Sequence, residues 1–195
     1  VFWSVENFWV LDACKSWLLQ QAKLKVLNEL WAKEWKEELS VRMWLHTWNA
    51  IIWNIWAEWR KMEFTALWDS VNLASRLEWV NKFYWTNICV SEDIYLEVKD
   101  VFTFRYLDTI RVKWKNIWIK IYELISYSWE SWIFKQNIIN DFENAVEMYK
   151  NKGFEDAIKI FKDLASLWDN PSKVYEKRCE IFIKSPPKDD WDGIW

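Results

Sequence analysis

An asparagine and an arginine four positions apart, Asn72 and Arg76, are the residues of this sequence best suited to chemistry. On a helix they project from the same face, about 40° apart. An amide beside a planar, permanently charged guanidinium suits a ligand that carries a sugar and a phosphate. On spacing alone, a surface helix whose polar residues are solvated is the simpler explanation of the pair.

The other reactive residue types give no second site. His46 is the only histidine, and one imidazole makes neither a histidine-rich metal site nor a Ser-His-Asp triad, so we interpret it as structural. Asp69 directly precedes a predicted helix and is interpreted as its N-cap rather than as a metal ligand. The cysteines form no CxxC pair and leave one odd thiol, which favours a reduced, cytosolic setting; they are Cys14, Cys89 and Cys179.

The spacing of apolar residues predicts a mixture of helices and strands. Apolar residues three and four apart predict a helix from about 6 to 38. A hairpin is expected between strands at 41–45 and 50–55. The remaining predictions are a helix over 70–82, a short strand over 88–90, a short helix opening at Ser91, and strands over 102–113 and 117–125.

The C-terminal part has a helical pattern only. Residues 140–167 indicate two amphipathic helices joined at Lys152 and Gly153, with Gly153 suited to the position just after a helix. A third helix is predicted over 172–183. The spacing resembles a single tetratricopeptide pair, which is too short to form an independent array. We therefore expect this tail to dock onto the preceding domain rather than to bind a peptide.

Charge and composition exclude several classes of protein. The 195 residues include 26 Lys+Arg and 29 Asp+Glu, a net charge of −3. That balance gives no electrostatic reason to expect nucleic acid or an anionic membrane as the main partner. A hydrophobic content of 52% is enough for a core. No run approaches about 18 consecutive apolar residues, so no membrane-spanning segment is predicted.

The numbers of tryptophan and glycine are abnormal. The sequence has 20 tryptophans and 2 glycines, whereas average usage of about 7% would give roughly 14 glycines. We hypothesise that the gene comes from a bacterium that reads UGA as glycine, and that these codons are written here as tryptophan. Trp191 and Trp195 are interpreted as genuine, and Trp3, Trp31 and Trp35 stay open. Tryptophans stand where turns and strand ends usually have glycine, asparagine or aspartate, as at Trp44, Trp48, Trp53, Trp68 and Trp85.

With glycine at those places, the segment from Phe64 to Glu78, FTALWDSVNLASRLE, resembles the catalytic domain of class III adenylate and guanylate cyclases. The resemblance covers roughly residues 1–125 and is most specific in DSVNLASRLE. It continues through Asn81, Lys82, Thr86, Ser91 and Glu92, then through RVKWK at 111–115 and IYEL at 121–124.

The resemblance implies an α+β fold with a ferredoxin-like sheet. We therefore expect a cyclase catalytic domain over 1–127, the tetratricopeptide-like tail over 133–185 and a C-terminal extension over 186–195.

The same resemblance implies roles for four residues. Asn72 would orient the ribose, and Arg76 would stabilise charge on the transferring α-phosphate. Lys113 would bind the triphosphate; its alternative is an exposed lysine at a strand end. Thr65 would accept the exocyclic amine of adenine, which favours ATP over GTP, while its structural alternative is a β-branched strand residue.

Cyclases of this family hold two metal ions, Mg²⁺ or Mn²⁺, on two aspartates that polarise the α-phosphoryl group and activate the ribose 3′-hydroxyl. The opening VFWS resembles the segment that follows the second aspartate, so both are expected upstream of Val1 and no metal ligand is assigned to this chain. We expect a fragment of a longer protein, inactive by itself.

The resemblance also implies a setting. Its sites form between two subunits, so the parent is expected to be a homodimer with an upstream sensor domain. We expect a cytoplasmic domain; whether the parent is anchored to a membrane stays open.

The leading hypothesis is an adenylate cyclase that converts ATP to cyclic AMP and pyrophosphate. The alternatives are a guanylate cyclase, a non-catalytic cyclase-like domain that regulates or dimerises, and a helical interaction module centred on the tail.

Overall fold

The computed structural model describes residues 9–47, 52–55, 63–66, 79–112, 117–130 and 133–195. Its main sheet has four strands in the order β1–β4–β6–β5, and a second sheet pairs β2 with β3. β1 runs parallel to β4, and the other pairs are antiparallel. The strands are β1 (Met43–Leu45), β2 (Ile52–Ile55), β3 (Glu63–Ala66), β4 (Ile88–Ser91), β5 (Phe102–Val112) and β6 (Ile117–Tyr127). The expected α+β class is confirmed.

The predicted hairpin between 41–45 and 50–55 is wrong. β1 pairs with β4, Met43 lying opposite Ile88, while β2 pairs with β3. Alternation shows that a segment is extended but not which strand lies beside it, and β3 was not among the predicted strands. A parallel pair needs a long connection, which residues 46–87 supply.

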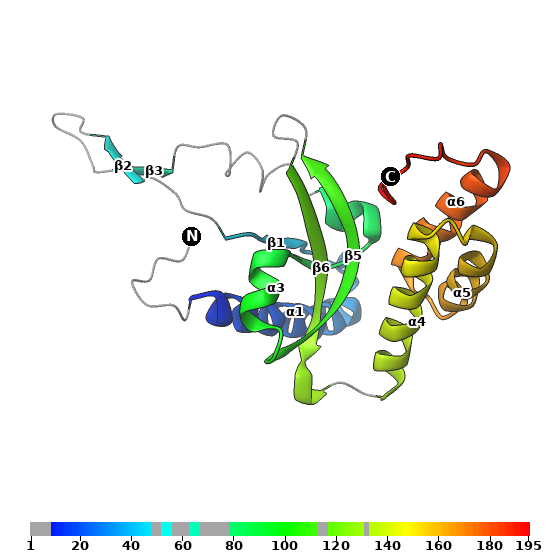
Figure 1. The fold of residues 1–195 in the computed structure, drawn as a ribbon. Helices are drawn as coiled ribbons and strands as arrows, with labels where there is room; N and C mark the ends of the chain where they lie inside the picture. The colour runs from blue at the N-terminus through cyan, green and yellow to red at the C-terminus, as the bar shows by residue number, and fades with distance from the viewer. Residues whose placement is uncertain (1–8, 48–51, 56–62, 67–78, 113–116, 131–132) are drawn as a thin grey trace.

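Helices cover both faces of the main sheet (Figure 1). α1 (Trp9–Lys33) and α3 (Glu92–Val98) share an apolar cluster with Tyr122 and Leu124 of β6. The neighbouring Ile121 belongs to a second cluster, because successive side chains of a strand point to opposite faces. That second cluster includes Val80 and Tyr84 of the helical segment 79–84 and apolar residues of the tail.

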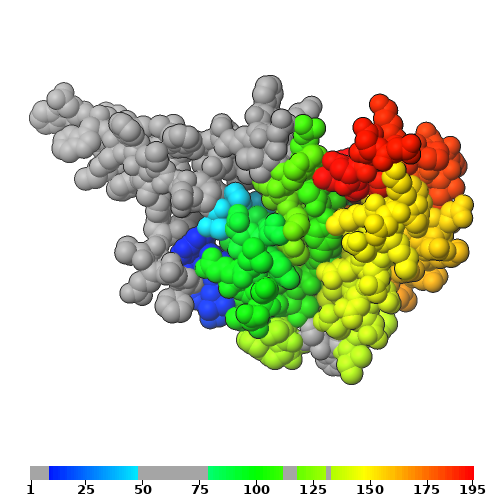
Figure 2. Space-filling model, in the orientation of Figure 1, coloured from blue at the N-terminus to red at the C-terminus, as the bar shows by residue number. Residues whose placement is uncertain are grey.

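The tail consists of α4 (Ile133–Lys150), α5 (Phe154–Ser166) and α6 (Asn170–Lys184), preceded by the short turn η1 (Ser128–Glu130). Its three helices gather at the β5 side of the sheet, and the space-filling view shows them directly against the strands (Figures 1 and 2). Phe142, Phe161 and Tyr175 are fully buried in the shared cluster. Among the described residues, no helix has the length and apolarity that crossing a membrane requires.

The tail also covers the outer edge of β5, which has a strand neighbour only on its β6 side within the described sheet. The Tyr106 N–H donates to Glu143 of α4 (2.8 Å). The Tyr175 hydroxyl of α6 donates to the carbonyl of Leu107 (2.7 Å). These bonds fall beside an irregularity in the β5–β6 register between Tyr106 and Asp108.

Three tryptophans have a left-handed backbone, with φ of 58° at Trp35, 58° at Trp85 and 67° at Trp168. Each stands just after a helix, and the N–H of the residue that follows it donates to a carbonyl of the last helical turn. After α1, for example, the Lys36 N–H donates to the carbonyl of Trp31 (3.1 Å). This is the position at which helices most often have glycine. All three side chains point into solvent, with exposed fractions of 97%, 69% and 84%.

Two expected helix ends need correction. α1 ends at Lys33 rather than near residue 38, because the left-handed Trp35 stops it and a tryptophan gives no stop signal in the sequence. Gly153 does not occupy the left-handed position after α4. Lys152 does, with φ 62°, while Gly153 is the N-cap of α5 with φ −80°.

Candidate functional site

The structure locates one of the four residues to which the sequence assigns a ligand-binding role. Thr65 lies in β3, opposite Trp53 of β2. Asn72, Arg76 and Lys113 lie outside the described residues, as does Asp69. The structure therefore neither brings the four together nor separates them.

Described elements follow or precede the undescribed candidates directly along the chain. Residues 79–84 are helical and begin three positions after Arg76, inside the helix predicted over 70–82. Lys113 comes immediately after β5, which ends at Val112. The position of the candidate residues therefore depends on the contacts that hold helix 79–84 and β5 in place.

Asn81 attaches helix 79–84 to the sheet. Its side-chain amide donates to the carbonyl of Met43 in β1 (2.8 Å), and its side-chain oxygen accepts from the Thr86 hydroxyl (2.9 Å). Both residues are almost completely buried. Thr86 also lies 3.1 Å from the Cys89 sulfur. Asn81 and Thr86, which belong to the segment that resembles cyclases, therefore have a structural role here.

A second attachment joins the helix to β5 and α6. The Tyr84 hydroxyl donates to Asp108, and Arg178 donates to Asp108 (2.8 Å) and to the Tyr84 oxygen (2.9 Å). Their exposed fractions are 1%, 4% and 5%. Burial, and then the charge of Asp108, raise the pKa of Tyr84 well above its usual value, so the phenol stays protonated and serves as a donor.

Sequence reasoning missed this triad. A carboxylate beside the apolar Leu107 in β5, a strand with mostly buried side chains, is a signal that Asp108 has a partner. Nothing in the sequence pairs it with Arg178, which is 70 positions away.

A second buried arginine joins the sheet to the tail elsewhere. Arg105 of β5 pairs with Glu123 of β6 and with Asp169, the N-cap of α6. Its guanidinium also lies over the ring of Phe142, 4.9 Å from the centroid. Arg105 is 5% exposed, so its burial matches that of Arg178, but none of these contacts reaches helix 79–84.

His46 follows β1 and is half-buried. Burial lowers its pKa, while the charge of Asp93 opposes that shift. A neutral imidazole beside the sheet agrees with the structural interpretation and does not add to the candidate site.

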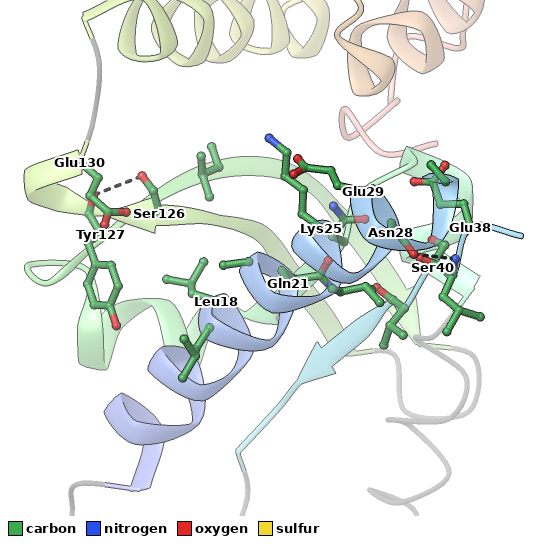
Figure 3. A pocket seen from close by; sticks show the side chains of 18 of the residues that line it. Leu18, Gln21, Lys25, Asn28, Glu29, Glu38, Ser40, Ser126, Tyr127 and Glu130 are labelled. Carbon is green, nitrogen blue, oxygen red and sulfur yellow. Dashed lines mark hydrogen bonds between the residues drawn. The ribbon is translucent and has the colours of Figure 1, made fainter. Parts of the chain in front are cut away.

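A cavity of about 1020 Å³ lies beside α1 (Figure 3). Two of its amides hold the segment after α1 in place: Gln21 donates to the carbonyl of Val41 (2.7 Å), and Asn28 bonds both main-chain groups of Leu39 (2.8 and 3.0 Å). The cavity therefore lies between α1 and the segment that these two amides hold against it. We assign it no ligand.

Within the described ranges, no group of three or more His, Cys, Asp or Glu residues could hold a metal ion. No step of the mechanism below is assigned to a metal.

Comparison with known proteins adds to this geometry. No protein-family model matches the chain. Adenylate cyclase 1 of Rhizobium meliloti (strain 1021) is 33% identical over 113 residues, which is 58% of this chain and 17% of that protein. The terminal-differentiation-specific adenylate cyclase of Dictyostelium discoideum is 33% identical over 131 residues, covering 64% of this chain and 6% of that protein. Over this region the chain is similar to adenylate cyclases.

A solved structure also resembles the chain. The adenylyl cyclase CyaB from P. aeruginosa is 25% identical, with 60% of this chain and 58% of that chain covered and a TM-score of 0.46. The chain spans less than a fifth of either curated adenylate cyclase. The activity of a whole protein is accordingly a matter of proposal.

Proposed function

We propose that this chain is the C-terminal part of the catalytic region of a class III adenylate cyclase, followed by a helical tail. The similarity to two proteins named as adenylate cyclases carries the proposal, together with the DSVNLASRLE block that holds Asn72 and Arg76. ATP is the proposed substrate, and cyclic AMP and pyrophosphate are the products. The proposed setting is cytoplasmic, where ATP is available.

In the proposed reaction the ribose 3′-oxygen attacks the α-phosphorus and forms a new P–O bond. The bond from that phosphorus to the bridging oxygen breaks, pyrophosphate leaves with that oxygen, and the 3′-hydroxyl proton passes to water. Asn72 orients the ribose so that the 3′-oxygen faces the phosphorus. Arg76 donates hydrogen bonds to the phosphate oxygens as negative charge builds up on them. Lys113 binds the pyrophosphate that leaves. The Thr65 hydroxyl oxygen accepts a hydrogen bond from the exocyclic amine of adenine.

The proposal includes a division of the site between chains. One subunit contributes Asn72 and Arg76, and its partner in a homodimer contributes the acidic residues that would hold Mg²⁺ or Mn²⁺. Those acidic residues belong to a longer parent protein, which also has an upstream sensor domain. This chain is then inactive alone.

We further propose that Trp35, Trp85 and Trp168 are glycines in the protein that the cell makes, because all three have a left-handed φ and exposed indoles. The gene decides this proposal. UGA codons at the three positions support it, and UGG codons overturn it.

The test of the function is cyclic AMP formation from ATP by the longer parent protein, made with the cell's own genetic code. Arg76→Ala should lower kcat by about 100-fold or more, since it removes a charge donor used mainly in the transition state. Arg42→Ala, an exposed arginine just before β1, serves as the matched control and should retain normal turnover.

A parent protein without any cyclase activity would overturn the proposal in favour of a non-catalytic regulatory domain. Faster turnover of GTP than of ATP would instead assign a guanylate cyclase. Normal turnover of the Arg76→Ala variant would remove that residue from the mechanism.

A further inference from the structure

The buried triad of Tyr84, Asp108 and Arg178 joins three parts of the chain that are far apart in the sequence. Tyr84 closes helix 79–84, Asp108 belongs to β5, and Arg178 belongs to α6 of the tail. Each member contacts both of the others through the bonds of 2.8 and 2.9 Å and the bond from Tyr84 to Asp108. The tail therefore contacts the helix that follows the candidate motif through a directional polar contact.

Such a triad is a costly way to hold three segments together. A buried ion pair loses its hydration, and an apolar trio of similar volume is often as stable or more so. What the charged triad adds is direction, because the bonds form only when the helix has one rotation and one height against β5. The aromatic packing of the tail on the sheet lacks that constraint.

The position of Tyr84 along its helix gives this constraint a consequence. The sequence predicts one helix from about 70 to 82, and the structure shows helix at 79–84. Tyr84 lies eight positions after Arg76 in the sequence. Fixing helix 79–84 therefore limits where the segment directly before it, which carries the candidate motif, can lie.

We propose that Arg178 is a positioning residue for the candidate nucleotide motif: through Asp108 and Tyr84 it fixes helix 79–84, which begins three positions after Arg76. This inference rests on the proposed cyclase function. It makes the helical tail a working part of the catalytic region, since α6 supplies the guanidinium.

The chain offers a matched control in Arg105. Both arginines are 5% exposed, both bond acidic partners and both join the sheet to the tail. They differ in one respect that matters, because only Arg178 contacts helix 79–84. A general loss of tail docking should affect both variants alike, whereas a loss of positioning should affect only Arg178.

The experiment compares Arg178→Gln, Arg178→Lys and Arg105→Gln in the longer parent protein, at a temperature where all are folded by circular dichroism. Arg178→Gln should lower kcat by about 10- to 100-fold with KM nearly unchanged, because a displacement of about 1 Å affects a transition-state contact most. Arg178→Lys, which keeps a charge facing Asp108, should recover part of the loss. Arg105→Gln should keep kcat within about threefold.

A milder variant guards against misfolding. Tyr84→Phe removes one hydroxyl and leaves the Arg178–Asp108 pair, so it should fold and still lower kcat by about 3- to 10-fold. In hydrogen exchange, amides of residues 79–84 should exchange faster in Arg178→Gln than in Arg105→Gln.

The outcomes separate the inference from the proposed function. An active parent in which Arg178→Gln and Tyr84→Phe have normal kcat overturns the positioning role alone. Equal losses in the two arginine variants overturn it as well and leave the tail a stabilising role only. A wild-type parent without activity overturns the proposed function, and the positioning role with it.

Discussion

At the scale of single residues, the tryptophans after helices are the most unusual feature. A left-handed backbone costs a residue with a side chain about 1–2 kcal/mol, and glycine pays no such cost. Trp35, Trp85 and Trp168 have that backbone, whereas Trp31, four positions before Trp35, lies inside α1. The structure thus distinguishes two tryptophans that the sequence left equally open.

Replacing Trp35, Trp85 or Trp168 with glycine should raise the free energy of unfolding by about 1 kcal/mol each, after allowing for the greater freedom of glycine in the unfolded chain. Urea denaturation measures the change. Trp31→Gly is the control and should lower stability by about 1 kcal/mol or more, since glycine disfavours a helix interior. Equal destabilisation at all four positions would contradict the backbone argument.

At the scale of elements, the start of α6 combines two functions in one side chain. Asp169 accepts from the Ser172 N–H (3.1 Å) as the N-cap and also pairs with Arg105 of β5. The helix therefore begins where its cap can also reach the sheet. Loss of this carboxylate removes a cap and leaves a buried guanidinium with one partner fewer.

Asp169→Ala should lower the free energy of unfolding by about 4 kcal/mol, from a cap worth about 1 and a buried pair whose breaking costs about 3. Asp169→Ser keeps a capping oxygen and should recover about 1 kcal/mol of that loss. Denaturant unfolding of both variants, beside the exposed Asp163→Ala as control, gives the numbers. Equal losses for alanine and serine would show that the cap contributes nothing.

The elements also show how far sequence reasoning reaches. The long strands β5 and β6 and helices α5 and α6 follow from local spacing of apolar residues, and their predicted ranges are close to those observed. Helix α4 begins at Ile133, seven residues before the predicted start at 140. The partner of β1 does not follow, because pairing depends on the long connection to β4 and not on β1 itself. Tyr84, Asp108 and Arg178 were missed for the same reason: Asp108 signals that it has a partner, but only the fold shows which residues those partners are.

The candidate site depends on a different kind of information. Asn72 and Arg76 gain a role only through the resemblance of their block to cyclases, since their spacing alone equally describes a surface helix. Thr65 is placed in β3, but the three other candidates lie outside the described residues, so their grouping remains a prediction.

At the scale of the whole molecule, the sheet and the tail share one core. The cluster that contains Cys89 of β4 also contains Cys179 of α6, while Cys14 of α1 lies in the cluster on the other face. All three thiols are free and fully buried. Because the tail completes the core of one sheet face, we expect the domain and the tail to unfold together.

The three thiols report on this cooperativity. Burial raises the pKa of Cys14 and of Cys179 from 9.0 to about 12, so at pH 8 neither reacts as a thiolate in the folded chain. All three should become reactive toward a thiol reagent over one and the same urea range. Reaction of Cys179 at a lower urea concentration than Cys14 would show that the tail unfolds separately.

The same shifts predict a pH dependence. A thiol whose pKa is higher in the folded than in the unfolded chain contributes stability that is fully present below pH 9 and is lost as the pH rises from 9 to 12. The urea midpoint of unfolding should therefore fall as the pH rises from 9 to 12. Replacing Cys14 and Cys179 with serine should make that fall smaller.

The covering of β5 by Glu143 and Tyr175 matters while the protein is being made. The ribosome synthesises β5 well before α4 and α6, so the nascent sheet has an open border until the last helix emerges. An open strand border pairs readily with the strand of another molecule. A chain released early, after β6 but before α6, would thus aggregate. The cell would then lose this protein through aggregation and not through a defect in its catalytic residues.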